Sequence, residues 1–344
     1  MNLRPISTYA RELKPLLSPG MFAPARSRLL WAPVHVAVVA VAISAMARGW
    51  VSGWLWPLVS LVIGMSFAGI TFLAHETLHG AVVRNKRLRH AVGWLGFLPF
   101  LISPRLWVAW HNKVHHGHAN DPRTDPDANP TLLQYEASRQ VQIVTNHFTP
   151  GRESLTGVLG ILVGLSGQSA GVLLSAGKLG YLSRRQHRLA ILETALSVAF
   201  WLVVLALVGP LVFVFAFLIP LVVANSIVMA FIFTNHGLSP VTHTNDPLAN
   251  SLSVTTPRLV DWLTLGFGFH VEHHLFPAMS SRQAPELRAH LLTLWPERYQ
   301  SMPLWRALLT MHRTGRVYHD DVTLGDPRTG RMWSALVPRV RAVP

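Results

Sequence analysis

The chain has 344 residues; half of them are apolar, only 13% are charged, and the mean hydropathy is positive. Soluble domains carry about 25% charged residues, so this composition excludes an ordinary soluble protein and indicates a membrane protein. The absence of cysteine excludes disulfides, iron–sulfur clusters and thiolate-ligated haem. The net charge of +14 does not indicate nucleic-acid binding, because the basic residues are spread over every polar segment.

The predicted elements begin after residues 1–28, which we interpret as a cytoplasmic tail because they lack a short apolar core with a cleavage site. A bilayer-spanning helix needs about 20 predominantly apolar residues. Four segments meet that requirement: Leu29–Met46, Trp54–Ala74, Leu189–Val208 and Leu211–Phe233. Only Arg48 is basic between the first two, and Gly209-Pro210 alone links the last two, so we predict two tight hairpins.

The distribution of Lys and Arg predicts the orientation. Five precede the first span, thirteen lie between the second and third, and eleven follow the fourth, whereas the two hairpin turns hold only Arg48. By the positive-inside rule, both termini and the long polar segments are expected to be cytoplasmic.

Two further apolar stretches are ambiguous. His90–Ser103 is too short to span and contains Gly and Pro, so we expect an interfacial or re-entrant piece. Ser154–Gly177 is long enough but rich in glycine and serine, and we expect it to be interfacial, because a fifth span would separate the histidine clusters described below.

The predicted fold class is therefore an all-α integral membrane protein, with four transmembrane helices in two hairpins and a cytoplasmic helical cap that carries the histidine clusters. We expect a tail over 1–28, a four-span domain over 29–281, and a cytoplasmic cap and tail over 282–344 with one helix near Ala284–Leu294.

Nine of the eighteen histidines lie just beyond the apolar segments, in three clusters plus His236. The clusters are His75-Glu-Thr-Leu-His79, His111-Asn-Lys-Val-His115-His116 and His270-Val-Glu-His273-His274. Residues three and four apart share a helix face, so each cluster can chelate a metal. Neutral imidazole is a common ligand of iron, copper and zinc, and nine exceed the needs of one ion, which indicates two metals.

The other histidines are interpreted as packed or solvent-bonded residues, with His118 a candidate to support a ligand. The remaining eight are His35, His90, His147, His187, His243, His290, His312 and His319.

The order and spacing of the clusters resemble the membrane fatty acid desaturase and hydroxylase superfamily. The local sequences His270-Val-Glu-His-His-Leu-Phe-Pro277 and Asn120-Asp-Pro-Arg-Thr-Asp-Pro-Asp127 carry the same resemblance, which covers Trp54 to Leu294. It implies a four-span scaffold that holds two non-haem irons and uses dioxygen to attack an unactivated C–H bond. Some members carry an asparagine four residues before the histidine that corresponds to His236; Ile232 stands there, which leaves Asn235 as a substitute.

The resemblance implies nine iron ligands: His75, His79, His111, His115, His116, His236, His270, His273 and His274. Carboxylates commonly accept the second ring N–H of a metal-bound histidine. The acids available for that role are Glu76, Glu272, Asp125, Asp127 and Asp261. Trp107 and Trp110, before the second cluster, are expected to belong to an interfacial aromatic belt, with a substrate tunnel as the alternative.

The function expected from the resemblance is an oxygen-dependent desaturase that introduces a double bond into the acyl chain of a lipid or acyl carrier. A lipid or hydrocarbon hydroxylase on the same di-iron site is the alternative. A histidine-rich metal transporter or multihaem cytochrome is remote, because only His35 lies within a predicted span and Glu193 is the only acid there.

The sequence also implies a separate electron donor, either a ferredoxin or a small haem carrier with its reductase. The chain has no cysteine and no dinucleotide-binding glycine motif, so electrons must come from outside. We expect a basic surface to attract an acidic carrier or lipid headgroups. Its arginines would be Arg282, Arg288, Arg298, Arg306, Arg313 and Arg316.

Overall fold

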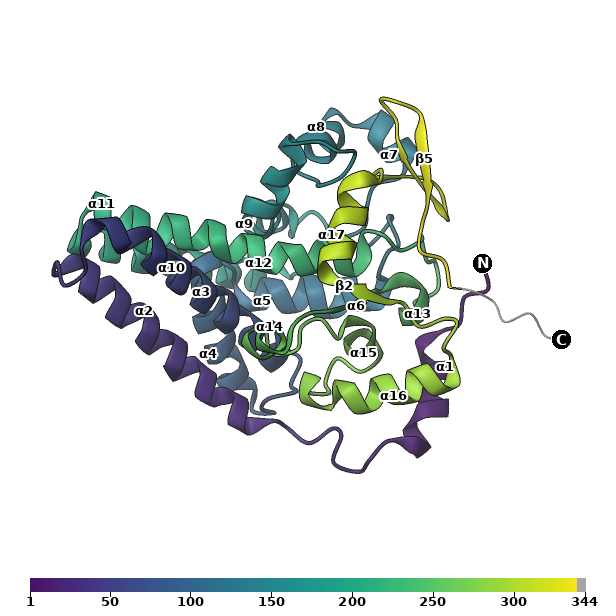
Figure 1. Cartoon of the computed structure of the whole chain (residues 1–344), viewed down its shortest axis with the longest axis horizontal. Helices are drawn as coiled ribbons and strands as arrows, with labels where there is room; N and C mark the ends of the chain where they lie inside the picture. Colours follow the sequence, from purple (N-terminus) through teal and green to yellow (C-terminus); the bar gives the residue numbers. More distant parts are fainter. Residues whose placement is uncertain (339–344) are drawn as a thin grey trace. The chain divides into compact units, whose positions relative to one another are not determined.

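The computed structural model describes residues 1–338, which divide into two compact units (Figure 1). Unit 1 comprises Met1–Ala23, His111–Ile161 and the described residues from Ala230 onward, and unit 2 comprises Pro24–Trp110 and Leu162–Met229. Two helices, α9 (Leu159–Ser175) and α12 (Ile219–His236), have residues in both units.

Unit 2 is built from apolar helices. They are α2 (Trp31–Ala47), α3 (Trp56–Leu78), α4 (Lys86–Phe97), α5 (Pro104–Trp107), α10 (Arg184–Val208) and α11 (Pro210–Phe213). The helices α2 and α3 form an antiparallel pair (Figure 1). Small residues let backbones approach closely in such bundles. At Gly96, for example, a Cβ atom would lie 2.5 Å from the Ile70 carbonyl oxygen of α3, so no larger residue fits.

Five helical segments are long and apolar enough to cross a membrane, which shows a multi-pass membrane protein. They are Arg26–Ala47, Gly53–Leu78, Thr156–Ser175, Arg184–Val208 and Pro210–His236. Four of them contain the predicted spans. The additional one, Thr156–Ser175, has the lowest mean hydropathy of the five, 1.7, and coincides with the segment expected to be interfacial.

The ambiguous stretch around His90–Ser103 forms a sharp bend. The helical segments Lys86–Phe100 and Pro104–His118 meet at 101°, and Leu101 makes the turn with a φ of 59°. Glu193 of α10 fastens this bend, because it accepts hydrogen bonds from His90 at 2.9 Å, Ser103 at 2.6 Å and Arg105 at 2.6 Å. A buried carboxylate is stable only when it is paired in this way.

Unit 1 is polar and mixes short helices with two small sheets. Its helices are α1 (Ile6–Leu13), α6 (His116–His118), α7 (Leu132–Ala137), α8 (Arg139–His147), α13 (Pro247–Asn250), α14 (Arg258–Leu263), α15 (His270–Leu275), α16 (Ala284–Leu294) and α17 (Leu304–Arg313). Strand β1 (Ser253–Thr255) pairs in parallel with β2 (Ser301–Pro303). The antiparallel sheet contains β3 (Val317–Asp320), β4 (Thr323–Asp326) and β5 (Arg331–Ser334), drawn in yellow in Figure 1.

The helix predicted near Ala284–Leu294 is confirmed as α16, whose bounds are the same. The sheet after it was not predicted, because strands of three or four residues are too short to show an alternating pattern. The N-terminal segment is part of the core of unit 1: Tyr9, Leu13 and Met21 are buried against α15 and α16.

A buried ion pair holds the N-terminal helix in unit 1. Arg298 lies 2.6 Å from the carboxylate of Asp246, which also accepts hydrogen bonds from the Tyr9 hydroxyl and the Arg4 backbone N–H. Burial raises the pKa of Asp246, although its donors favour the charged form. The pair therefore joins three segments that are distant in the sequence.

We predict that Asp246→Asn lowers the free energy of unfolding by about 3–5 kcal/mol, because it leaves the buried Arg298 cation without a carboxylate. Denaturant unfolding of the detergent-solubilised protein measures the change. The matched control is Glu12→Gln, which breaks the exposed Arg4–Glu12 pair at 2.5 Å and should cost less than about 1 kcal/mol. Equal effects of the two substitutions would contradict the assignment.

Candidate metal centre

Four buried histidines of unit 1 converge on one point. The ligand nitrogens of this four-histidine cluster all lie within 4.8 Å of one another, and its members are His115, His236, His270 and His274. The Nε2 atom of His236 is 2.6 Å from Nε2 of His270 and 3.1 Å from Nε2 of His274. The rings come from the helix Val108–His115, the end of α12, and α15.

Three more histidines of unit 1 form a second group, the three-histidine cluster. His116 Nε2 lies 3.2 Å from His111 Nε2 and 3.1 Å from His273 Nε2. The two clusters adjoin, since the rings of His116 and His274 stack with their centroids 4.3 Å apart. Unit 1 thus brings together seven of the nine predicted ligands.

The local helix type explains the contact between His111 and His116, which are five residues apart. Residues Val108–His115 form a π-helix, in which hydrogen bonds join residues i and i+5. An α-helix would have placed His111 over His115 instead. Sequence spacing alone could not distinguish these arrangements.

The remaining predicted ligands, His75 and His79, lie together at the end of α3 in unit 2, with ring centroids 4.8 Å apart. The indole ring of Trp107 packs edge-on against both, at centroid distances of 5.2 and 5.3 Å. Trp107 and Trp110 are buried, so the prediction that they form an interfacial belt is wrong.

Hydrogen bonds orient two rings of the four-histidine cluster. His115 Nδ1 donates to Asp125 at 3.0 Å, with an Asp127 oxygen 3.4 Å away. His236 Nδ1 donates to the backbone carbonyl of Asn250 at 2.8 Å. Because Nδ1 holds the proton, Nε2 of each neutral ring presents a lone pair to the cluster.

The surroundings give the rings different affinities for protons. Burial alone would lower the pKa of His115, but Asp125 and Asp127 outweigh it and raise that pKa to about 9. Burial and then the neighbouring imidazoles lower the pKa of His274 well below its usual value. The structure therefore combines a negatively charged support with rings that resist carrying a positive charge.

The donor set fits transition-metal ions. Buried neutral nitrogens that face one another at 2.6–3.1 Å, with no carboxylate among them, have the chemistry of metal ligands. The amide of Asn235, beside His236, is fully buried, and neither its oxygen nor its nitrogen has a hydrogen-bond partner among the described residues. Such a group indicates an additional species in the site.

The comparisons with known proteins agree with this site. The model of the family described as "Fatty acid desaturase" matches residues 48–305. The chain belongs to the fatty acid desaturase family. Membership places it among oxidoreductases, and the match includes all nine predicted ligands.

Several curated relatives of this desaturase-family chain are similar over different lengths. An acyl-lipid (7-3)-desaturase of Diacronema lutheri is 27% identical over 325 residues, covering 83% of this chain and 68% of the relative. A Delta(12) fatty acid desaturase of Mortierella isabellina is 24% identical over 290 residues, with 73% and 72% covered. A dihydrorhizobitoxine desaturase of Bradyrhizobium elkanii is 34% identical over 89 residues, and the match spans only a quarter of each chain.

The carboxylates of this desaturase-family site differ in role. Asp125 and Asp127 support His115 as predicted, whereas Glu272 points to other groups: it accepts from Ser253 at 2.6 Å, Tyr299 at 2.6 Å and Arg288 at 2.9 Å. Glu272 thereby anchors α15 from the side away from the histidines. Asp261 accepts from Thr256. The prediction that Glu272 and Asp261 bond a ligand histidine is wrong.

Two residues that sequence reasoning missed fix the segment around His236. The side-chain amide of Asn120 donates to the backbone carbonyls of His236 and Pro240, both at 3.2 Å. Arg316 donates to the carbonyls of Gly237, Pro150 at 2.8 Å and Met311 at 2.6 Å. Only the acidic run after Asn120 signalled either residue.

Not all of the predicted arginine surface is on the surface. Arg298 and Arg316 are buried, and Arg288 is paired with Glu272, so this part of the prediction is wrong. Burial lowers the pKa of Arg316 to about 9, which still leaves the guanidinium charged at neutral pH. Arg306 and Arg313 are exposed.

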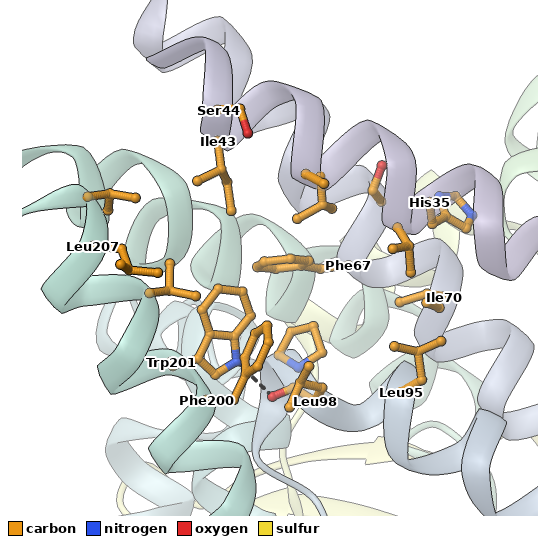
Figure 2. A pocket seen from close by; sticks show the side chains of 17 residues that line it. His35, Ile43, Ser44, Phe67, Ile70, Leu95, Leu98, Phe200, Trp201 and Leu207 are labelled. Carbon is orange, nitrogen blue, oxygen red and sulfur yellow. Dashed lines mark hydrogen bonds between the residues drawn. The ribbon is translucent and has the colours of Figure 1, made fainter. Parts of the chain in front are cut away.

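Unit 2 contains an apolar groove of about 370 Å³ between α2, α3, α4 and α10 (Figure 2). His35, Ile70 and Leu95 lie at one end, and Ile43 and Leu207 at the other. The Trp201 indole donates to the Leu98 carbonyl at 3.0 Å, which fixes its ring in the wall. A groove of this composition suits a hydrocarbon chain.

We predict that Asp125→Asn lowers metal affinity about 10- to 100-fold, because the amide holds His115 less firmly in the required tautomer. Metal content after dialysis against graded chelator measures the change. Asp261→Asn is the matched control, since Asp261 bonds only Thr256 and should leave metal content unchanged. Equal metal retention in the two variants would show that Asp125 does not support a ligand.

Proposed function

We propose that this protein is an oxygen-dependent desaturase that uses two histidine-bound iron ions to introduce a double bond into the acyl chain of a membrane lipid. The observation that carries the proposal is the adjacency of two buried histidine clusters whose Nε2 atoms converge. Family membership supports the reaction class. The acyl-lipid relative from Diacronema lutheri and the apolar groove support a lipid substrate.

The proposed iron ligands are the nine predicted histidines. One iron is assigned to the four-histidine cluster and a second to the three-histidine cluster, and His75 and His79 complete the set. Nine nitrogens exceed the six positions of an octahedral ion, which favours two metals over one. Bound iron would supply the activation of dioxygen that cleavage of an unactivated C–H bond requires.

The protein's own groups would hold this chemistry in place. Asp125 and the Asn250 carbonyl retain the Nδ1 protons of His115 and His236, so these rings stay oriented throughout turnover. Burial of the clusters excludes bulk water, which would otherwise compete for the reactive centre.

Electron balance supports the proposal of an external donor. Desaturation takes two hydrogens from the chain, and reducing one dioxygen to two waters requires two further electrons and two protons. We assign these electrons to a separate ferredoxin or small haem carrier with its reductase, since the chain has no cysteine to bind a cluster of its own.

A second candidate is oxygen insertion into the C–H bond. A zeaxanthin 4-ketolase of Chlamydomonas reinhardtii is 33% identical over 88 residues, although the match covers only 23% of this chain and 19% of the relative. Both reactions begin with hydrogen abstraction, so product analysis distinguishes them.

The clusters also support four spans. His115 and His236 lie with ring centroids 4.7 Å apart, and three candidate spans separate them in the sequence. Two points on one side of a bilayer must be joined by an even number of crossings, so one of the three segments does not cross. We propose that it is Thr156–Ser175, the least apolar, and that both termini and the metal site are cytoplasmic.

We predict that purified protein contains two irons and little zinc, and that His116→Ala and His273→Ala abolish desaturation without preventing membrane insertion. The measurements are metal analysis and mass spectrometry of lipids from cells that express each variant, with an electron donor present. His319→Ala, an exposed histidine outside the clusters, is the control and should retain activity. One zinc and no iron would refute the di-iron proposal, and hydroxylated lipids would favour the second candidate.

The topology predicts which side each loop occupies. In this cysteine-free chain, Lys178→Cys, between α9 and α10, should react with an impermeant thiol reagent only from the cytoplasmic side. Ser52→Cys, in the turn between α2 and α3, should react only from the opposite side. Labelling of both from the same side would mean that Thr156–Ser175 crosses the membrane.

A further inference from the structure

Two short helices of unit 1 start from paired strands and expose large apolar side chains. Thr255 of β1 and Pro303 of β2 are in register, and α14 and α17 follow these strands directly. In α14, Leu259 is 66% exposed and Trp262 is 59% exposed. In α17, Trp305 is 67% exposed and Leu309 is 39% exposed.

The exposed residues occupy one face of each helix. Leu259 and Trp262 are three residues apart, and Trp305 and Leu309 are four apart, which are the spacings of one helix face. The opposite face of α17 is already packed, because Ala307 and Met311 are buried. The exposed tryptophans and leucines are therefore additional to the core.

Positive charge accompanies these apolar faces. Arg258 begins α14, and Arg306 and Arg313 belong to α17; all three are exposed. Within residues 1–338, none of the three forms an ion pair with a carboxylate. The sequence of α17 contains no acidic residue, and the one acid of α14, Asp261, is hydrogen-bonded to Thr256.

We propose that α14 and α17 form an interfacial anchor that lies in the headgroup region of an anionic bilayer. Tryptophan prefers the membrane interface, where its apolar ring and its N–H group are both accommodated. Unpaired arginines beside it match anionic phosphate groups. A bilayer is favoured over a protein partner because unit 1 is covalently continuous with the membrane-length helix α12, whose last turn carries His236.

The anchor would connect the bilayer surface to the third histidine cluster. Ser253, in the strand that leads to α14, donates to Glu272 at 2.6 Å and accepts from the Val271 backbone N–H at 2.9 Å. Both partners belong to α15, which carries three of the proposed ligands. The depth of α14 and α17 in the interface would therefore set the height of α15 above the hydrocarbon.

The absence of cysteine makes site-directed spin labelling a direct test. Single variants Leu259→Cys and Leu309→Cys keep both tryptophans and place a nitroxide on each proposed face. In nanodiscs that contain phosphatidylglycerol, oxygen should broaden both spectra more than a water-soluble nickel chelate does. Thr329→Cys, in the exposed turn between β4 and β5, is the aqueous control, and Leu202→Cys, 57% exposed on α10, is the hydrocarbon control.

Nickel accessibility at positions 259 and 309 equal to that at 329 would overturn the proposal and would leave the face for a soluble protein partner. Adding Trp262→Ala and Trp305→Ala should shift both labels toward the aqueous value. Replacing phosphatidylglycerol with neutral phosphatidylcholine should produce a shift in the same direction. If lipid charge has no effect, the proposed contact between the arginines and anionic headgroups is wrong.

Discussion

The electrical neutrality of closely packed imidazole rings is the constraint on which the rest of unit 1 depends. The facing nitrogens of the four-histidine cluster are too close for several rings to be protonated together, and burial removes the water that would screen them. Each ring must therefore dispose of its proton on the far side. Asp125 and the Asn250 carbonyl perform that task for His115 and His236.

These supporting groups in turn require their own support. Asn250 offers its carbonyl because Asp246 caps α13, and Asp246 is paired with Arg298 beside the N-terminal helix. Glu272 fixes the outer side of α15 through Ser253, Tyr299 and Arg288. The orientation of a few rings is thus coupled to segments from nearly the whole length of unit 1.

The sequence was sufficient for features with a long period or a strong composition. Membrane spans, hairpins and the i, i+4 histidines could be predicted because about 20 apolar residues or a helix turn leave a regular pattern. The π-helix before His116 left none, since it depends on tertiary packing rather than on residue type. The burial of Arg316 was equally hidden: its acceptors are backbone carbonyls, which every residue possesses.

Arg316 also bears on how large a fragment can retain the site. It lies beyond residue 305, where the family match ends, yet its guanidinium occupies the carbonyls of Pro150, Gly237 and Met311. The segment that follows His236 therefore depends on a residue outside the region that defines the family. Tyr9 and Arg4, which contact Asp246, extend the same dependence before residue 48. A fragment cut at the borders of the family match would keep every proposed ligand and lose the groups that aim them.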